Sequence, residues 1–211
     1  MIEVIDNLVQ IAVTAAAALG SAVAFGRSRR QEWFLLTCFY GTFALGGLYW
    51  VLYLLLMSRT PQIFYVSDLC WAATFAFLMT LEISLPETEE ERRFRHPAMW
   101  LAPCFCVPML IFFMRWGDYA MNACWCVLSG ISGWFSIRGM LYARRQQGQE
   151  RERQYFHMVV LVFLILEYAL WTASGFWCGD TLANPYFWID FLITGSLAVL
   201  WFAMRRGETA E

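Results

Sequence analysis

Long apolar runs, each bounded by a short polar segment, follow one another along the whole chain. Their pattern predicts seven helices, at roughly residues 4–25, 33–57, 62–85, 98–114, 119–142, 155–177 and 185–204. Each run is close to the ~20 apolar residues that a helix needs to cross a bilayer. The sequence therefore predicts an all-α, single-domain bundle of seven transmembrane helices, with the lipid bilayer as its first partner.

Prolines mark the ends of several of these runs. Pro61 precedes the third run, and Pro86 and Pro97 enclose a charged loop, because proline cannot continue a helix. Pro103 and Pro108 lie inside the fourth run and predict a kink, which neighbouring helices in a membrane can accommodate.

The composition agrees with a membrane protein and excludes one kind of chemistry. Hydrophobic residues make up 60% of the 211 residues and aromatic residues 18%, which lies outside the usual balance of soluble domains. All basic residues are arginine, so no lysine is present to form a Schiff base, such as that of a usual retinal pigment. We expect no nucleic-acid partner.

The arginines predict the orientation in the membrane. Nearly all of them follow the first, third, fifth and seventh runs, whereas Arg59 and Arg115 stand alone on the other side. Because positive residues stay in the cytoplasm, the N-terminus is expected outside and the C-terminus in the cytoplasm. The expected location is the inner (plasma) membrane, with several crossings.

Two similar stretches carry an aspartate into an apolar run. Residues 61–71 contain a proline, then aromatic residues and Asp68, and residues 184–192 contain Pro185, aromatic residues and Asp190. A carboxylate inside a membrane is costly and therefore marks a functional site. The alternative is that these aspartates cap helix N-termini or hydrogen-bond to a neighbouring helix.

A third acid lies deeper. Glu167 is near the centre of the sixth run, where it cannot easily reach water, and helical spacing puts it on one stripe with Trp171. Asp68 and Trp71 share a stripe on the third run in the same way. Carboxylates among aromatic faces suit a cationic or aromatic ligand. The candidate ligand-binding residues are Asp68, Trp71, Glu167, Trp171, Asp190, Trp50, Tyr49 and Trp188.

Patterns that could indicate catalysis or a metal are weak. The Gly-x-Ser-Gly pattern around Ser132 matches that of rhomboid-like proteases, but His157 is expected near the cytoplasmic end of its helix, far from that serine. There are two Cys-x-Cys pairs, at 104/106 and 124/126, and the two cysteines of each pair point to different sides of a helix, which does not suit a metal site. We predict no enzyme activity, no metal and no cofactor.

An internal repeat is a further hypothesis. The spacing from Trp50 to Asp68 differs by a single residue from that of Trp171 to Asp190. Both helix pairs would cross the membrane in the same sense, which corresponds to a parallel repeat of three helices, a linker helix and three helices. Chance similarity between aromatic helices that begin at a proline is the alternative.

The chain also resembles an uncharacterised family of small bacterial seven-helix membrane proteins. The similarity lies in residues 34–41, 61–69 and 184–188. The resemblance implies a seven-helix fold, and no activity is attached to that family.

Three classes of function fit the sequence. The first is a receptor-like sensor that binds a small cationic or aromatic ligand in an outward-facing cavity and signals to a separate cytoplasmic or membrane protein partner. The second is a small secondary transporter, for which Glu167 and the repeat are the arguments and which could act as a homodimer. The third is a non-catalytic subunit of a membrane complex.

Overall fold

The computed structural model describes residues 2–57, 61, 66–86 and 88–206. The described part is almost entirely helical. In chain order its helices are α1 (Ile2–Ser28), α2 (Gln31–Met57), α3 (Val66–Ser84), α4 (Glu89–Arg93), the 3-10 turn η1 (Pro97–Trp100), α5 (Leu101–Phe113), the 3-10 turn η2 (Met114–Trp116), α6 (Tyr119–Ala143), α7 (Gln149–Phe176) and α8 (Pro185–Arg206).

Seven spans in the described residues are long and apolar enough to cross a membrane. They are α1, α2, α3, the continuous η1–α5–η2 segment, α6, most of α7 and α8. The seven predicted helices are thereby confirmed, and the chain is a multi-pass membrane protein. Residues 62–65, which the sequence pattern assigns to the third helix, lie outside the described residues.

Two local features differ from the expectation. The helix predicted to begin near residue 155 begins at Gln149, because its polar first turns consist largely of glutamine, glutamate and arginine, which are good helix formers. Gly148, at φ +64°, provides the turn before it. In addition, the charged loop after α3 contains the short helix α4, whose N-cap Thr88 accepts a hydrogen bond from the Glu91 amide.

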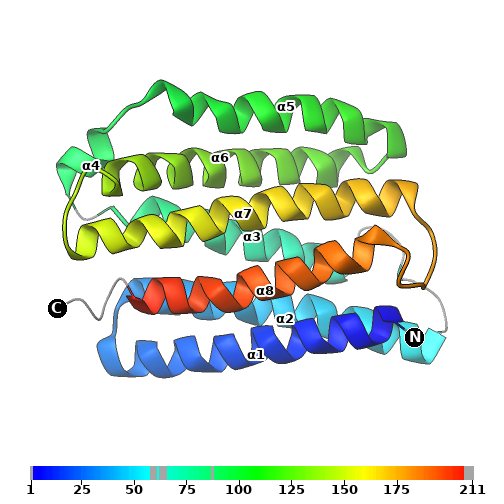
Figure 1. Ribbon diagram of the computed structural model, residues 1–211. Coiled ribbons are helices and arrows are strands. Elements are labelled where there is room, and N and C mark those ends of the chain that lie inside the picture. The colour runs from blue at the N-terminus through cyan, green and yellow to red at the C-terminus, as the bar shows by residue number, and fades with distance from the viewer. Residues whose placement is uncertain (1, 58–60, 62–65, 87, 207–211) are drawn as a thin grey trace.

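Six of the long helices form a closed ring. α1, α2, α3, α6, α7 and α8 follow one another around it, each contacts the next, and α8 contacts α1. α5 lies outside the ring against α6 (Figure 1). The aromatic side chain of Phe105 in α5 also contacts that of Tyr168 in α7, with 5.1 Å between the ring centroids. Pro103 lies in the first turn of α5, where its missing amide hydrogen costs little.

The burial pattern of α1 is the inverse of that in a soluble helix. Its buried residues are all polar: Asp6, Asn7, Gln10, Thr14 and Ser21. Its large apolar side chains, such as Leu19 at 70% exposure, point outward. Lipid can solvate such apolar side chains, whereas polar groups must find partners inside the bundle. α1 is therefore built for an apolar surrounding.

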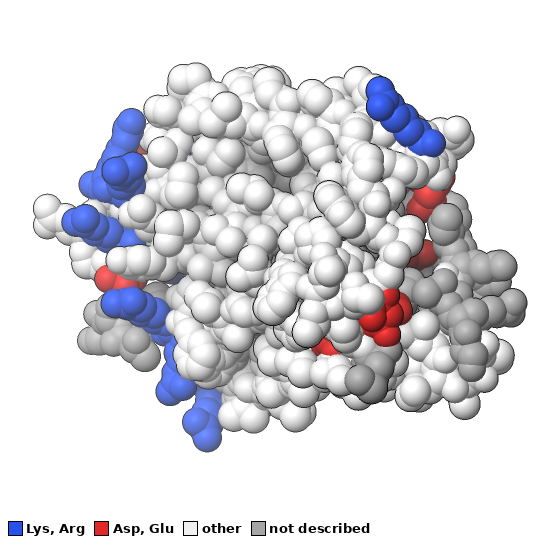
Figure 2. Space-filling model, turned by 45° about the vertical axis from the view of Figure 1, so that its right-hand side comes forward, with Lys and Arg blue, Asp and Glu red and all other residues white. Residues whose placement is uncertain are grey.

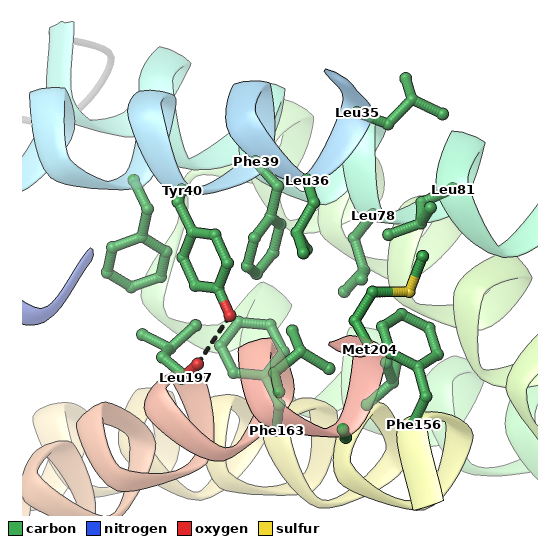
Figure 3. Packing of buried hydrophobic residues seen from close by; sticks show 14 of the residues in the cluster. Leu35, Leu36, Phe39, Tyr40, Leu78, Leu81, Phe156, Phe163, Leu197 and Met204 are labelled. Atoms are coloured by element: carbon green, nitrogen blue, oxygen red, sulfur yellow. Dashed lines mark hydrogen bonds between the residues drawn. The ribbon is translucent and has the colours of Figure 1, made fainter. Parts of the chain in front are cut away.

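An aromatic and aliphatic core fills the middle of the ring. Phe39 and Tyr40 of α2 meet Phe163 of α7, and all three side chains are fully buried (Figure 3). The Tyr40 hydroxyl donates a hydrogen bond of 2.7 Å to the carbonyl oxygen of Leu197 in α8. This core separates the two ends of the bundle.

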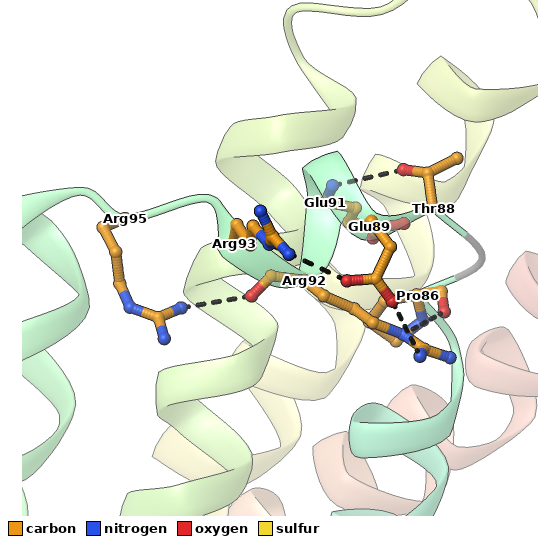
Figure 4. Close-up of polar contacts among 7 residues, drawn as sticks. All are labelled: Pro86, Thr88, Glu89, Glu91, Arg92, Arg93 and Arg95. Carbon is orange, nitrogen blue, oxygen red and sulfur yellow. Dashed lines mark hydrogen bonds and ion pairs between the residues drawn. The ribbon is translucent and has the colours of Figure 1, made fainter.

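The two ends differ in charge. Figure 2 shows most arginines at one end of the molecule and acidic side chains toward the other. At the arginine-rich end Glu89 of α4 lies 3.4 Å from Arg92 and 3.8 Å from Arg93 (Figure 4). There Arg206 of α8 also pairs with Glu152 of α7, at 2.9 Å. The N-terminus of α1 lies at the opposite end (Figure 1).

Candidate functional site

A cavity of about 420 Å³ lies at the end of the bundle that carries the N-terminus. All six helices of the ring and the turns between them contribute to its lining, and the exposed turn residue Asp180 lies at its rim. We call it the acidic cavity. Its lining residues are Glu3, Asn7, Gln10, Phe43, Trp50, Pro61, Asp68, Trp71, Asp118, Trp125, Glu167, Leu170, Trp171, Ser174, Trp177, Gly179, Asp180, Asn184, Tyr186, Phe187 and Asp190.

The lining combines acids with aromatic rings. It contains six carboxylates and five tryptophans, while none of its described residues is arginine or histidine. A cleft lined by one sign of charge between apolar walls concentrates the opposite charge. The charge of the lining and its indole faces are thus both of the kind that complements a cation.

Glu167 occupies the α7 side of the acidic cavity. Its carboxylate interacts electrostatically with that of Asp190, and no described residue hydrogen-bonds to it. The Ser174 hydroxyl, which also lines the cavity, donates to the carbonyl oxygen of Trp171, at 2.8 Å. Glu167 is thus a carboxylate that faces the cavity and retains its hydrogen-bonding capacity for a ligand.

Asp190 is held by a neighbouring helix. Gln10 Nε2 of α1 donates to Asp190 Oδ1 at 2.6 Å and lies 3.3 Å from the Thr194 hydroxyl. The cap of α8 is supplied by Asn184, whose Oδ1 accepts from the Tyr186 amide at 2.9 Å. Of the two structural alternatives for Asp190, the structure therefore shows hydrogen bonding between helices, and Asp190 lines the acidic cavity as well.

Two further acids approach the cavity from its rim. Asp68 lies in the first turn of α3 and belongs to the lining. Asp118 precedes α6 in the left-handed conformation, at φ +51°, and makes no side-chain capping bond to that helix. Burial raises the pKa of the Asp118 carboxyl above its ordinary value. The rim thus adds acid groups to those deeper in the cavity.

The tryptophans of the cavity are positioned by specific contacts. Trp50 stacks obliquely on Trp71 with 5.7 Å between the ring centroids, and its indole N–H donates to Glu3 Oε1 at 3.0 Å. The Trp171 indole donates to Asn122 Oδ1 at 3.2 Å. These contacts hold the rings at the cavity wall.

The structure places two of the predicted ligand residues away from the cavity lining. Tyr49 packs on Tyr53, with 5.9 Å between the centroids. Trp188 is 56% exposed and donates to the Leu182 carbonyl oxygen at 2.8 Å. Residues one or two positions apart on a helix do not share a face. Because Trp50 and Asp190 face the cavity, Tyr49 and Trp188 point in other directions.

Sequence reasoning missed the contribution of α1. Glu3, Asn7 and Gln10 line the acidic cavity, and Asp6 lies buried beside it. The signal was present, because Glu3, Asn7, Gln10 and Thr14 are spaced by four, three and four residues, which puts them on one helix face. Trp125 of α6 and Tyr186 of α8 carry no comparable signal.

A second buried polar group lies on the far side of the core. Glu82 of α3 accepts a hydrogen bond from the Ser136 hydroxyl at 2.6 Å, and His157 Nδ1 lies 2.8 Å from its other oxygen. His157 thus pairs with Glu82 and not with Ser132, whose hydroxyl has no partner among the described residues. Within the described part of the chain, no cluster of three or more His, Cys, Asp and Glu side chains could hold a metal ion.

No known protein family, curated protein or solved structure matches the chain. The resemblance to a family of small bacterial membrane proteins therefore stays a hypothesis. The fold and the site define a seven-helix multi-pass membrane protein with an acidic, tryptophan-lined cavity.

Proposed function

We propose that the protein is a receptor-like membrane protein that binds a small organic cation in the acidic cavity. The observation that carries this proposal is the lining, in which Glu167 and Asp190 face a space walled by tryptophans such as Trp71 and Trp171, with no described cationic side chain among them. A ligand with a positive charge and an apolar or aromatic body would satisfy both kinds of group.

The size of the cavity fits such a ligand. A volume of about 420 Å³ lies within the range of pockets that hold small organic molecules. Glu167 has no described hydrogen-bond partner, so an ammonium group would supply the donor or counter-charge that it lacks. A fully hydrated inorganic ion would leave the tryptophan walls without a role.

The proposal includes an orientation and a location. Most arginines lie at the end of the bundle opposite to the cavity (Figure 2). Under the positive-inside rule this end is cytoplasmic, the N-terminus is outside and the cavity receives its ligand from outside the plasma membrane. The ligand would then shift the helices, and the cytoplasmic ends would pass the change to a separate protein partner.

Transport is the second candidate. The ring places α1, α2 and α3 together and α6, α7 and α8 together, with α5 outside, which is the arrangement that a parallel 3+1+3 repeat would give. Against transport stands the core of Phe39, Tyr40 and Phe163, which fills the bundle beyond the cavity. A transporter would have to open that core, alone or as a homodimer.

Equilibrium binding to the purified protein in lipid nanodiscs tests the proposed ligand class. The probe is benzyltrimethylammonium, and benzyl alcohol is its uncharged control. We expect the cation to bind and Glu167→Gln to weaken its binding about tenfold, the equivalent of one charge-assisted contact of ~1.4 kcal/mol. The matched control is Glu89→Gln at the arginine-rich end, which should leave the affinity unchanged. Equal binding of probe and alcohol, or equal effects of both substitutions, would contradict the proposal.

Flux separates the receptor from the transporter. The same probe is offered to proteoliposomes that contain the protein or its Glu167→Gln variant. Binding without uptake favours the receptor, whereas uptake that Glu167→Gln abolishes makes the protein a transporter. A subunit that only assembles a complex would bind no probe and would co-purify with a stoichiometric partner.

A further inference from the structure

Asp6 is a fully buried carboxyl group that receives no hydrogen bond from any described N–H or O–H group. It lies on α1 at 0% exposure, and neither of its oxygens receives a hydrogen bond from the described residues. The carboxyl group of Asp190 in α8 interacts with that of Asp6 both electrostatically and as a side-chain hydrogen-bond partner. Two acids from different helices thus meet in the interior beside the acidic cavity.

Among the described residues that line the cavity, no side chain offers a positive charge to this pair. α7 contributes Glu167 on the cavity side, and α8 contributes the hydroxyl of Tyr186, which lies within electrostatic range of both aspartates. α1 adds Glu3, and α2 brings Trp50 without a charge. Asp68 of α3 and the rim residue Asp180 are acids as well. Every titratable side chain that faces the pair from the described residues is therefore an acid.

We propose that Asp6 and Asp190 share one exchangeable proton, and that an organic cation in the acidic cavity displaces it. Two adjacent and almost completely buried carboxylates cannot readily both keep a negative charge, and a proton between them gives the O–H donor that the Asp6 oxygens lack. The shared proton is inferred from the buried pair alone. Its displacement by a cation rests on the proposed function.

A proton fits this pair better than a metal ion. Gln10 directs its amide N–H at Asp190 Oδ1 from 2.6 Å, so one acceptor site of that carboxyl group is already used by a hydrogen bond. The described residues also contain no group of His, Cys, Asp and Glu side chains that could hold a metal. A single shared proton needs only the two carboxyl groups.

Competition with the ligand follows from the position of the pair. Asp190 belongs both to the pair and to the lining of the acidic cavity. A cation near Asp190 and Glu167 stabilises the ionised form of the pair, so the proton leaves to solvent as the cation binds. By linkage, a high proton concentration must weaken cation binding to the same extent.

Infrared spectroscopy of the protein without ligand tests the shared proton. We expect a carbonyl stretch of a protonated carboxylic acid near neutral pH that shifts in D₂O and on isotopic labelling of aspartate, but not of glutamate. Asp6→Asn and Asp190→Asn should each remove it, and Asp180→Asn at the exposed rim should retain it. The labelling needs no substitution, so its result stands even if a variant fails to fold. Absence of an aspartic acid band in the native protein would overturn the proposal.

Proton release tests the coupling. In weakly buffered solution, addition of benzyltrimethylammonium should release up to one proton per bound probe, and affinity should rise up to tenfold per pH unit while the pair is protonated. Asp6→Asn should abolish both effects and retain binding. Binding without release in the native protein would overturn the coupling but leave the proposed ligand class intact. An aspartic acid band without any probe binding would refute the ligand class and leave the shared proton.

Discussion

His157 Nδ1 lies 2.8 Å from Glu82 Oε2, inside the half of the bundle that carries the arginines. The two residues are 75 positions apart in the chain, and both are almost completely buried. The Ser136 hydroxyl holds the second oxygen of Glu82, so α3, α6 and α7 are joined at one point. The His157 ring lies against Gly139 of α6, which leaves no space for a side chain there.

Gly139→Ala should destabilise the protein. The new Cβ would collide with Nε2 of His157 and push the ring away from Glu82. Overpacking of this kind costs ~2 kcal/mol. Gly130→Ala on the same helix is the matched control, because its nearest neighbour would be Cys106 Sγ at an ordinary 3.8 Å. Thermal unfolding in detergent should show a lower midpoint for Gly139→Ala alone. Equal midpoints would show that the packing of His157 contributes no stability.

Gly46→Ala should weaken binding of the benzyltrimethylammonium probe. An added Cβ would lie 2.9 Å from the Trp71 indole nitrogen and 3.1 Å from Cys70 Cβ, so the Trp71 ring must leave its place at the cavity wall. Loss of one aromatic face costs ~1 kcal/mol, or about fivefold in affinity. Gly41→Ala on the same helix meets nothing within 4 Å and should retain native affinity. An unchanged affinity in Gly46→Ala would show that Trp71 does not contribute to binding of the probe.

Tyr40→Phe should lower the free energy of unfolding by ~1 kcal/mol, the usual net value of a buried hydrogen bond. The substitution removes the 2.7 Å bond to the Leu197 carbonyl oxygen between α2 and α8. Tyr49→Phe on α2 is the control, because Tyr49 is only half-buried and its described contact is with a ring. Equilibrium unfolding in mixed micelles compares the two variants. A larger loss for Tyr49→Phe would contradict the assignment.

Cys178 should react with a membrane-impermeant maleimide on intact cells. It is exposed in the turn between α7 and α8, at the end of the bundle that the positive-inside rule places outside, while the other cysteines lie within spans. Cys178→Ser should remove the labelling. A second variant that combines Cys178→Ser with Gln146→Cys moves the thiol to the arginine-rich end. It should react only after permeabilisation, and the reverse pattern would invert the orientation.

Much of the candidate site was predictable because the cost of a charge in a membrane is a local property. Asp68, Glu167 and Asp190 stand out in apolar runs, and all three line the acidic cavity. The polar spacing of Glu3, Asn7 and Gln10 was equally visible and predicts the buried face of α1. The role of Trp125 was not predictable, since an aromatic residue can face lipid or the interior.

The sequence by itself determined the number of spans, their approximate ends and the separation of arginines from the acids of the cavity. These features depend on the length and polarity of each run, which a bilayer selects directly. Only the tertiary structure decided the ring order, the place of α5 outside it, and the partners of Glu82, Asp190 and Asp6. A helix that is apolar on most sides does not indicate which side meets a neighbour. Such pairs arise from the packing of whole helices.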